Sequence, residues 1–420
     1  MVTRNDKPQG NGAAHRLVFC GDTAGMYNRD ILRAVAQAAH QYFPARIYLF
    51  HSPDTNDVQE ICAIKPLGIL VGGDKDTARI YQVVTAVVQR LHIPVVDVSA
   101  ATDVSPFQRV ISDDVQVGRI VAAYFMARGY RRLAFCGDEA LSWSIRRYRG
   151  FTSYAQEHGI LSVSRFNCRE NMSYPKGSRK DLSRWLTALP DGCALFASND
   201  RIANGVIEAC CTKGLRVPED IAVVGCDNDD LFGQLHSPPI SSVMLDTQQI
   251  GHNAINALAT AVKHRRGKGR HTPGRHPSEI LIPPLRIITR RSSDLFAVDD
   301  KLVQEALQLI RRHLAENISS KTLLYKLSKP ISRLTLYRRF MTALGRSPAA
   351  EINRVRFETA MRLLQDTPQS ISKIAEAAGF ASRRHFTFAF HREVGVTPRN
   401  FRERHLQSRF PMQSNPHDFS

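Results

Sequence analysis

Short apolar runs rich in β-branched residues alternate with helix-length amphipathic segments through the first two-thirds of the chain, and this alternation constrains the fold most strongly. The centres of most strand-like runs are apolar at consecutive positions, as in Leu17–Cys20 and Ile221–Val224. Strands buried on both faces are typical of parallel sheets covered by helices on either side. The sequence therefore predicts an α/β fold with doubly wound parallel sheets. The predicted strands are Arg16–Cys20, Arg46–Phe50, Gly68–Val71, Pro94–Val98, Leu133–Cys136, Ala194–Ala197 and Ile221–Val224.

The segments between these runs carry apolar side chains at the spacing of one face of an α-helix. Strands and helices together make more repeating units than one compact open sheet with a single site accommodates, so two successive lobes are predicted. In such folds a small ligand binds at the carboxyl ends of the strands. The predicted helices are Asn28–Gln41, Thr77–Leu91, Val115–Arg128, Ile145–His158 and Asp200–Lys213.

The last quarter of the chain, residues 300–408, follows a different pattern. It contains no strand-like run, and two similar helical patterns follow each other at a spacing of about fifty residues. Each consists of a short helix with one apolar face, a turn, a serine and a second helix, which is the order of a helix-turn-helix unit. A helix predicted over Ala349–Leu364 joins the two units. The sequence therefore predicts an all-α domain whose two recognition helices enter successive major-groove segments of DNA.

The second unit has the clearer pattern. Gly379 suits the left-handed turn that closes a helix, Phe380 can fill that turn, and Ser382 can cap the next helix. The side chains predicted to face inward are Ile371, Ile374, Ala375, Ala378, Phe386, Ala389 and Phe390. Those predicted to face outward are Arg383, Arg384, Thr387, Phe388 and His391.

The first unit repeats this order. The pattern predicts a turn at Ser328–Ile331 and a helix cap at Ser332. The side chains predicted to face inward are Leu323, Leu324, Leu327, Leu336 and Phe340. Those predicted to face outward are Arg333, Leu334, Tyr337 and Arg338.

The formal net charge of the chain, +18 at pH 7, indicates a polyanionic partner, with nucleic acid as the first candidate. Residues 299–420 contain 21 Lys/Arg and 11 Asp/Glu, so more than half of the basic excess lies in under a third of the chain. A second basic run begins at Lys263, in a stretch up to Pro277 that is predicted to be a surface loop. This loop is either a solvated charge run or a further DNA contact.

Other function classes lack their sequence signals. The eight cysteines form no CxxC pair and no Cys/His cluster with zinc spacing, so they are interpreted as small buried side chains in a reducing compartment. No metal or cofactor is predicted. No nucleophile elbow, P-loop lysine or GxGxxG is present, which disfavours an enzyme or a nucleotide-binding protein. The N-terminus up to His15 has no apolar signal core and no run reaches membrane-spanning length, so a cytoplasmic protein without a membrane partner is predicted.

The front part of the chain resembles the sugar-binding core of LacI/GalR-type regulators, which are related to periplasmic binding proteins. The resemblance covers about residues 15–293 and implies a two-lobed sensor. Residues 1–14 are too short for the DNA-binding helices that such regulators carry before the sensor. The motifs that carry the resemblance to the sugar-binding core are, in order, Arg147–Phe151, Ser198–Asp200 with Gly214–Asn228, Ser241–Val243, and a closing strand within Ile280–Ser293.

In this family the positions matching Arg147, Asn199 and Asp227 hold the ligand. These residue types suit a sugar because a carboxylate accepts from two hydroxyls, an amide donates and accepts, and a guanidinium donates in a rigid fork. Each also has a structural alternative: Arg147 as a surface charge, Asn199 as a helix cap, and Asp227 as a turn residue. Tyr27 and Trp143 are predicted to stack on a sugar face, and packing in the core or at the rim is their alternative.

The back quarter resembles AraC/XylS-type regulators over residues 300–405. Gly345–Pro348 is similar to that family's G-x-S-P motif, and Ile371–Phe390 with Gly395–Arg402 is similar to its signature. Pro330 in the first turn departs from the pattern and leaves the geometry of that unit open. The DNA-binding residues predicted from this resemblance and from the outward-facing pattern are Arg333, Leu334, Tyr337, Arg338, Arg383, Arg384, His385 and Thr387.

A LacI-like sensor before an AraC-type reader is an uncommon order, and the regulators that it resembles imply D-xylose or a near pentose as effector. The resemblance also implies activation of sugar-catabolic genes by a homodimer, with RNA polymerase as a further candidate partner. The alternatives are a transport-type sugar-binding protein without a DNA role and, with least support, an enzyme. The predicted organisation is a disordered tail over 1–14, a sensor over 15–293, a connector over 294–299, a DNA-binding domain over 300–408 and a disordered tail over 409–420.

Overall fold

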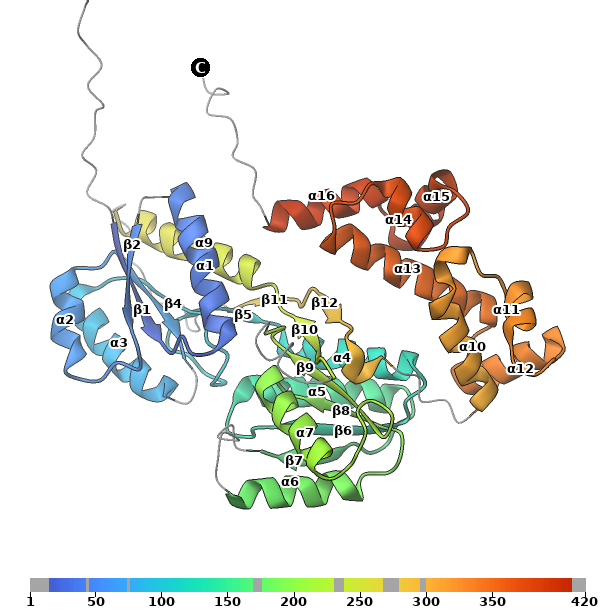
Figure 1. Cartoon of the computed structure of the whole chain (residues 1–420). Helices are drawn as coiled ribbons and strands as arrows, with labels where there is room; N and C mark the ends of the chain where they lie inside the picture. Colours follow the sequence, from blue (N-terminus) through green and yellow to red (C-terminus); the bar gives the residue numbers. More distant parts are fainter. Residues whose placement is uncertain are drawn as a thin grey trace, which may run out of the picture.

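Two α/β lobes and a helical domain make up the described chain (Figure 1). The computed structural model describes residues 15–42, 45–73, 76–168, 176–229, 238–266, 279–294 and 300–409. Four predictions lie wholly or mostly outside these residues: the tails over 1–14 and 409–420, the connector over 294–299 and the basic loop up to Pro277.

The first lobe is a six-stranded parallel sheet in the order β11-β5-β4-β3-β1-β2. Leu17 and Phe19 pack beneath α1 and α9, whereas Val18 and Cys20 pack beneath α2 and α3, because successive side chains of a strand point to opposite faces. The sheet is therefore buried on both faces, as the uniformly apolar runs predict. Its elements are β1 (His15–Gly21), α1 (Met26–Tyr42), β2 (Ala45–Phe50), α2 (Asp57–Ile64), β3 (Gly68–Gly72), α3 (Thr77–Leu91), β4 (Val95–Asp97), β5 (Gln108–Ser112), α9 (Thr247–Arg266) and β11 (Glu279–Ile282).

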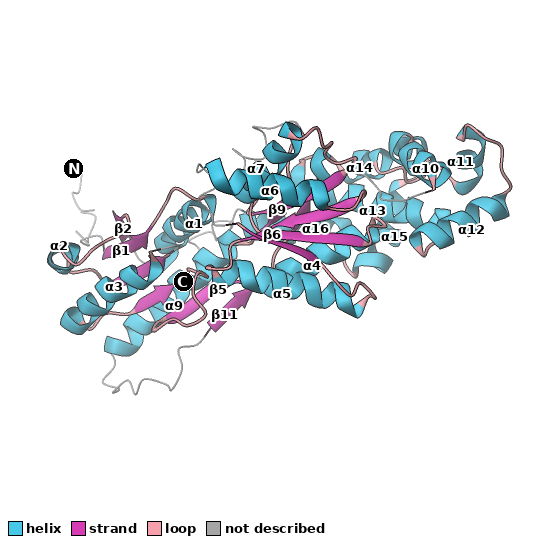
Figure 2. Cartoon of the chain, turned by 90° about the horizontal axis from the view of Figure 1, so that it is seen from below, coloured by secondary structure: helices cyan, strands magenta, loops and turns pink. Residues whose placement is uncertain are grey.

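The second lobe repeats this architecture in the order β12-β10-β9-β8-β6-β7, with β12 as its one antiparallel strand. Phe135 and Phe196 pack beneath α4 and α5, and Cys136 and Leu195 pack beneath α6 and α7. Figure 2 shows this sheet between the two helical layers. Its elements are α4 (Asp114–Ala127), β6 (Arg132–Gly137), α5 (Ser142–Glu157), β7 (Ser164–Asn167), α6 (Lys176–Ala188), β8 (Cys193–Ala197), α7 (Asp200–Thr212), β9 (Ile221–Cys226), β10 (Ser241–Met244) and β12 (Arg286–Ile288).

The chain crosses between the lobes at three places: after β5, after β10 and after β11. The prediction of one closing strand within Ile280–Ser293 is wrong. β11 pairs with β5 in the first sheet, whereas β12 pairs with β10 in the second. Pro283 and Pro284 stand between them and interrupt the strand, because proline has no N–H to donate to a ladder. The two-lobed α/β fold itself is confirmed.

The helical domain contains two small cores joined by one long helix. Side chains of α10, α11, α12 and the first half of α13 form one core, and the second half of α13 packs with α14, α15 and α16 in the other. The inward predictions for Phe340 and Phe386 are confirmed, since both are fully buried. The elements are α10 (Lys301–Arg312), α11 (Ser320–Lys326), α12 (Arg333–Leu344), α13 (Pro348–Asp366), α14 (Ile371–Ala377), α15 (Arg383–Val394) and α16 (Pro398–Arg409).

Serine side chains begin five consecutive helices of this domain. In each case the hydroxyl oxygen accepts a backbone N–H of the first turn, which satisfies a donor without an intrahelical partner. The caps predicted at Ser332 and Ser382 are confirmed, and Gly379 takes the predicted left-handed conformation with φ of 74°. The serine caps are Ser319, Ser332, Ser347, Ser370 and Ser382.

Candidate functional site

A cavity of about 110 Å³ lies between the two lobes, at the carboxyl ends of their strands. This is the position that parallel α/β sheets favour for a ligand. All five residues predicted to bind sugar line it. The lining residues are Asp22, Gly25, Met26, Tyr27, Asn28, Gly73, Ala100, Ser112, Trp143, Arg147, Asn199, Asp200, Arg201, Asp227 and Asp229.

Arg147 of α5 is a buried cleft residue and not the surface charge that was its alternative interpretation. Its Nε donates to Asp114 Oδ1 at 2.9 Å and one Nη donates to the Ser198 carbonyl at 2.6 Å. Asp227 Oδ1 lies 3.5 Å from the guanidinium. Trp143, one turn earlier on the same helix, places its ring 4.8 Å from the guanidinium carbon, a cation–π distance. Trp143 thus lines the cleft and also holds Arg147.

Two carboxyl groups, those of Asp227 and Asp200, share the second-lobe wall. Burial raises the pKa of Asp227, although Arg147 opposes this shift. Burial, and then the charge of Asp227, raise the pKa of Asp200 well above its ordinary value. Asp200 accepts from the Ser242 hydroxyl at 2.6 Å and from the Asp229 backbone N–H at 2.8 Å. The wall therefore concentrates acceptors in a poorly solvated place, which suits hydroxyl donors.

Asn199 fits both of its interpretations. It caps α7, because its side-chain oxygen accepts the Ile202 N–H at 2.9 Å, and it also lines the cleft. Tyr27 packs against the hydrophobic cores of both lobes and donates its hydroxyl to the Val98 carbonyl at 3.2 Å. Its ring is therefore placed where the lobes meet.

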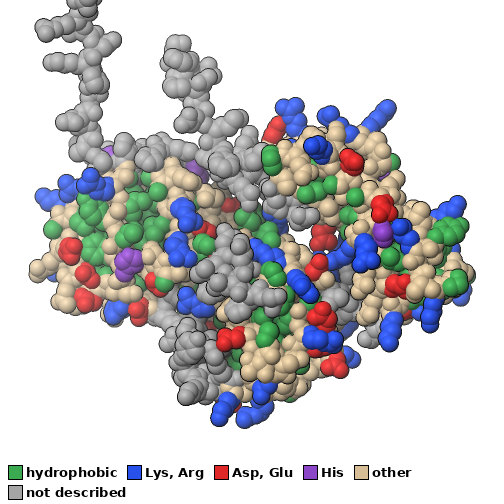
Figure 3. Space-filling view, in the orientation of Figure 1, with side chains coloured by type: hydrophobic (Ala, Val, Ile, Leu, Met, Phe, Trp, Pro, Cys, Tyr) green, Lys and Arg blue, Asp and Glu red, His purple; other side chains and the backbone are tan. Residues whose placement is uncertain are grey.

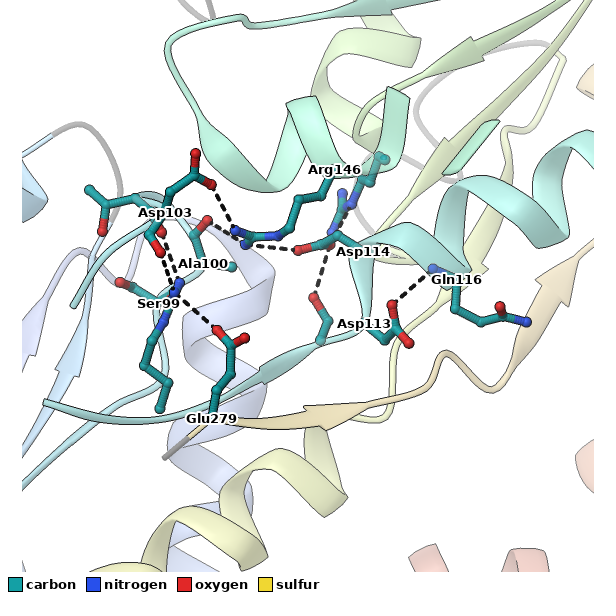
Figure 4. Close-up of polar contacts among 12 residues, drawn as sticks. Ser99, Ala100, Asp103, Asp113, Asp114, Gln116, Arg146 and Glu279 are labelled. Atoms are coloured by element: carbon teal, nitrogen blue, oxygen red, sulfur yellow. Dashed lines mark hydrogen bonds and ion pairs between the residues drawn. The ribbon is translucent and has the colours of Figure 1, made fainter. Parts of the chain in front are cut away.

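Arg146 connects the lobes beside the cleft. It belongs to α5 of the second lobe and donates to the Ala100 carbonyl of the first lobe at 2.9 Å (Figure 4). Weaker contacts at 3.4 Å reach Asp103 of the first lobe and Asp114 at the start of α4. A backbone bond from Ser142 to the Ala101 carbonyl, at 3.0 Å, supports the same junction. The two walls of the cleft are thus tied together on one side.

The helical domain presents its two recognition helices, α12 and α15, with exposed outer faces. Leu334 and Tyr337 on α12 are 57% and 46% exposed, large fractions for such side chains. Phe388 on α15 is 68% exposed. Figure 3 shows Lys and Arg side chains scattered over this domain. Of the residues predicted to bind DNA, all are exposed except Thr387, which is half-buried: Arg333, Leu334, Tyr337, Arg338, Arg383, Arg384 and His385.

Metal and membrane features are absent from the part of the chain that the structure describes. Across these residues no group of three or more His, Cys, Asp or Glu side chains could hold a metal ion. No helix among them is long and apolar enough to cross a membrane.

Comparisons with known proteins cover both parts of the chain. A family model described as a periplasmic binding protein-like domain matches residues 122–293, and one described as a helix-turn-helix domain matches residues 330–404. The xylose operon regulatory protein of Escherichia coli K12 is 28% identical over 400 residues, which are 93% of this chain and 97% of the relative. That of Haemophilus influenzae is 28% identical over 299 residues, 70% of this chain and 75% of its own. The chain is a DNA-binding transcription regulator.

Solved structures share the fold of this regulator, one over nearly the whole chain and others over about two-thirds of it. A structure described as a xylose-binding transcription activator covers 93% of this chain and 98% of its own, with a TM-score of 0.54 at 24% identity. A LacI family regulator of Enterococcus faecium with bound ribose covers 66% of this chain and 98% of its own, with a TM-score of 0.52 at 16% identity. The second likeness is limited to about the length of the sensor.

Several polar residues of the regulator's cleft were not predicted from the sequence. Asp114, Arg146 and Asp200 all contact one another or the predicted residues. Asp200 was visible next to Asn199, and its burial beside Asp227 is set by β9 and β10, which the sequence places far away. The prediction that Thr387 faces outward is only partly met, because α15 turns it toward the edge of the core.

Proposed function

We propose that the regulator is controlled by a monosaccharide, D-xylose or a closely related pentose, and that it activates sugar-catabolic genes. The observation that carries this proposal is the convergence of five polar or aromatic side chains from both lobes on one cavity. The near full-length similarity to xylose operon regulatory proteins supports the identity of the sugar. The five residues are Tyr27, Trp143, Arg147, Asn199 and Asp227.

The size and charge of the cleft favour a small neutral polyol. Its volume of about 110 Å³ lies below the roughly 300–1,000 Å³ of pockets for drug-sized ligands, so a monosaccharide fits better than an oligosaccharide. Its lining includes four aspartates against two arginines, one of which is Arg147. Arg147 is already engaged by Asp114 and Asp227. Such a lining repels a phosphate group and accepts from hydroxyls.

Within this cleft each residue has a definite task. Asp227 accepts from two sugar hydroxyls, while Arg147 donates to a hydroxyl or ring oxygen. Asn199 supports the same end of the ligand from the start of α7. Tyr27 and Trp143 cover the apolar C–H face of the ring, one from each lobe.

For DNA, the exposed N-terminal halves of α12 and α15 enter two major-groove segments. Arg side chains there suit the O6 and N7 atoms of guanine. The regulator acts as a homodimer on repeated half-sites in the cytoplasm, where it recruits RNA polymerase. The residues proposed to contact DNA are Arg333, Leu334, Tyr337, Arg338, Arg383, Arg384, His385 and Thr387.

One experiment separates this function from a transport-type sugar-binding protein. Calorimetry of the full chain with D-xylose, D-ribose, L-arabinose and D-glucose identifies the sugar, and an electrophoretic mobility shift on the promoter of a neighbouring sugar operon, with and without that sugar, tests control. We expect tight binding of one pentose and a salt-sensitive DNA shift that the sugar changes. Sugar binding without any salt-sensitive DNA shift would instead favour the transport class, and no binding of any sugar would refute the effector.

A further inference from the structure

Helix α4 reaches from the cleft to the DNA-binding domain. Its 14 residues, Asp114–Ala127, span about 21 Å at 1.5 Å per residue. Asp114, its first residue, contacts Arg147 of the cleft, and Arg128, the residue that follows its last turn, contacts the helix that joins the two helix-turn-helix units. One rigid element therefore touches both functional sites of the molecule.

At the cleft end, Asp114 is buried among groups that line or border the cavity. It accepts from Arg147 at 2.9 Å and from the hydroxyl of Ser112 at 3.0 Å. Arg146, which bridges to the first lobe, lies 3.4 Å from its second oxygen. Any ligand that draws Arg147 or the lobes together therefore acts directly on the first turn of α4 (Figure 4).

Helix α4 moves together with α5, because the two helices touch backbone to backbone. A Cβ on Gly118 of α4 would lie 2.0 Å from the Arg147 carbonyl oxygen, and a Cβ on Gly150 of α5 would lie 1.9 Å from the Val115 carbonyl oxygen. Only glycine permits this approach at both positions. Helix α5 carries Trp143 and Arg147, so a displacement of this wall of the cleft displaces α4 as well, because the two helix backbones are in direct contact.

At the other end, the buried Arg128 forms an ion pair with the half-buried Glu358 of the DNA-binding domain. Its side chain is only 2% exposed and donates to Glu358 of α13 at 2.9 Å. The guanidinium also lies 3.5 Å from the ring centroid of Tyr124, whose hydroxyl donates to Thr289 at 3.2 Å. Burial raises the pKa of Glu358, but the charges of Arg128 and Arg354 outweigh this effect and hold that pKa at about 2.

The contact continues along α13. Arg354 bridges Glu358 and the fully buried Glu351, at 2.9 and 2.8 Å. Arg346, just before α13, pairs with Glu351 and donates to the carbonyl of Ala127 at the end of α4. Helix α13 contributes to both cores of the DNA-binding domain. Any shift of the contact between α4 and α13 therefore moves both recognition helices.

The DNA-binding domain also touches the first lobe, because α16 packs against α9. A rotation of the lobes about the cleft cannot leave the α9–α16 contact and the α4–α13 contact both unchanged. A cavity of about 630 Å³ lies between Leu285–Thr289 and helices α10, α13 and α16, so the domain has room to move. The junction is therefore less tightly packed than the α4–α5 contact.

We propose that α4 is the coupling element of the regulator: it converts the state of the cleft into the orientation of α13 through the Arg128–Glu358 ion pair. The inference rests on the proposed sugar control, and it names how that control reaches the DNA-binding domain. The sensor selects between two docked arrangements of the reader that exist before ligand binds.

The first test measures coupling in the full chain. The ratio of promoter DNA dissociation constants with and without sugar is determined by fluorescence anisotropy, using D-xylose or whichever of the four sugars binds. In allosteric proteins this ratio is roughly 5–150, and we expect it to fall to within twofold of 1 in Glu358→Gln and in Arg128→Gln. The control is Asp181→Asn, because Asp181 forms an exposed ion pair with Arg184 within α6, away from α4 and from the DNA-binding domain. We expect this control to keep the unmodified chain's ratio.

The outcomes of this test are distinct. If the unmodified chain shows a ratio of 1 with every sugar, the proposed sugar control fails. If it shows coupling and both interface variants keep that coupling, the role of α4 is refuted. Calorimetry must show that Glu358→Gln still binds sugar, since Glu358 does not line the cleft.

A second test needs neither sugar nor DNA. Hydrogen exchange of residues 348–366 is compared between the unmodified chain, Asp114→Asn and Arg146→Gln. The control is Arg184→Gln, since Arg184 lies on α6, away from α4, and pairs with the exposed Asp181. We expect hydrogen exchange in α13 to be at least twofold faster in both cleft variants than in the unmodified chain. The control should exchange at the rate of the unmodified chain. Arg146→Gln serves if Asp114→Asn does not fold. Unchanged exchange in α13 for the folded cleft variants overturns the proposal.

Discussion

At the scale of single residues, the cleft concentrates features that do not favour stability. Asp227 has a φ of 99°, a conformation that L-residues other than glycine seldom adopt, and burial raises the pKa of its carboxyl. Asn228, its neighbour, also has a positive φ, at 51°. Such strain persists only where the surrounding structure enforces it, and here Asp227 lines the cavity between the lobes.

Replacing Asp227 by Asn should therefore stabilise the empty protein and weaken its binding of sugar. Asparagine carries no charge to bury and tolerates a positive φ better than most residues, so we expect the melting temperature of the sensor to rise by about 2 °C. Calorimetry should show at least a tenfold weaker sugar affinity. Asp181→Asn, at an exposed pair on α6, should change neither quantity. An unchanged sugar affinity in Asp227→Asn would refute its role.

The buried carboxyl of Asp200 predicts a pH dependence. Because its pKa is raised in the folded state, the stability that its protonated form contributes is fully present below its ordinary value of 3.8 and is lost as pH rises through the raised folded value. Asp200→Asn imitates the protonated form at every pH. We expect its gain in melting temperature over the unmodified chain to be larger at pH 8 than at pH 5, by differential scanning calorimetry. A pH-independent difference would contradict the shift.

On the DNA side, Arg384→Ala should relax sequence preference at one base pair. Arg384 is exposed in the first turn of α15, where a guanidinium reaches a base edge. The loss should be about 1–3 kcal/mol for the preferred base at one position, measured by competition with single-base operator variants. A uniform loss across all variants would show a phosphate contact instead.

At the scale of elements, the local patterns predict the strands whose own sequence is mostly apolar, including β2 at a sheet edge, and they miss β5, β7 and β10. The uniformly apolar runs match β1, β3, β8 and β9, because a strand buried on both faces has no polar position. β7, with the sequence Ser-Arg-Phe-Asn, is an edge strand whose exposed positions are polar. β5 and β10 gain their strand conformation from neighbours that arrive from distant parts of the chain.

The cleft shows the same limit. Arg147, Asn199 and Asp227 lie within local motifs, so a family resemblance could locate them. Asp114 and Arg146 take part only because α4 and α5 pack at their glycines and because the first-lobe loop at Ala100 reaches over. No local pattern specifies such a contact, since it depends on the relative placement of two lobes.

Gly379 gives an element-scale prediction with a matched control. Gly379 and Gly395 both end helices with φ near 75°, yet a Cβ on Gly379 would lie 2.0 Å from the Leu314 carbonyl oxygen, whereas a Cβ on Gly395 would meet nothing within 4 Å. Both alanine variants carry the backbone cost of a positive φ, and only Gly379→Ala adds a clash between the two units. We expect Gly379→Ala to be about 1–3 kcal/mol less stable than Gly395→Ala by denaturant unfolding. Equal stabilities of the two alanine variants would show that the turn at Gly379 can shift away from Leu314 at little cost in free energy.

At the scale of the whole molecule, α13 fixes the two recognition helices relative to each other. Arg356 of α13 donates to Asn317 and to the Ile318 carbonyl, at 2.7 and 2.9 Å, and so ties this helix to the first unit. Gly379 brings the turn of the second unit against Leu314 of the first. The DNA-binding domain therefore holds its two helix-turn-helix units at a fixed distance and orientation.

A rigid reader should be sensitive to the spacing of its DNA target. Inserting about five base pairs between the two contacted major-groove segments moves one of them to the opposite face of the helix. We expect at least a hundredfold loss of affinity in a mobility shift, and about ten inserted base pairs should not restore full binding, because α13 cannot lengthen. Retained affinity after the five-base-pair insertion would show that the two units bind independently.

The three crossings between the lobes have a consequence for how such a gene can be rearranged. The first lobe is built from residues up to Ser112 and again from residues 247–282, so no single cut separates it from the second. The helical domain, in contrast, begins and ends as one continuous segment, 300–409. Recombination can therefore exchange the helical DNA-binding domain in one event, whereas the two lobes of the sensor must be inherited together.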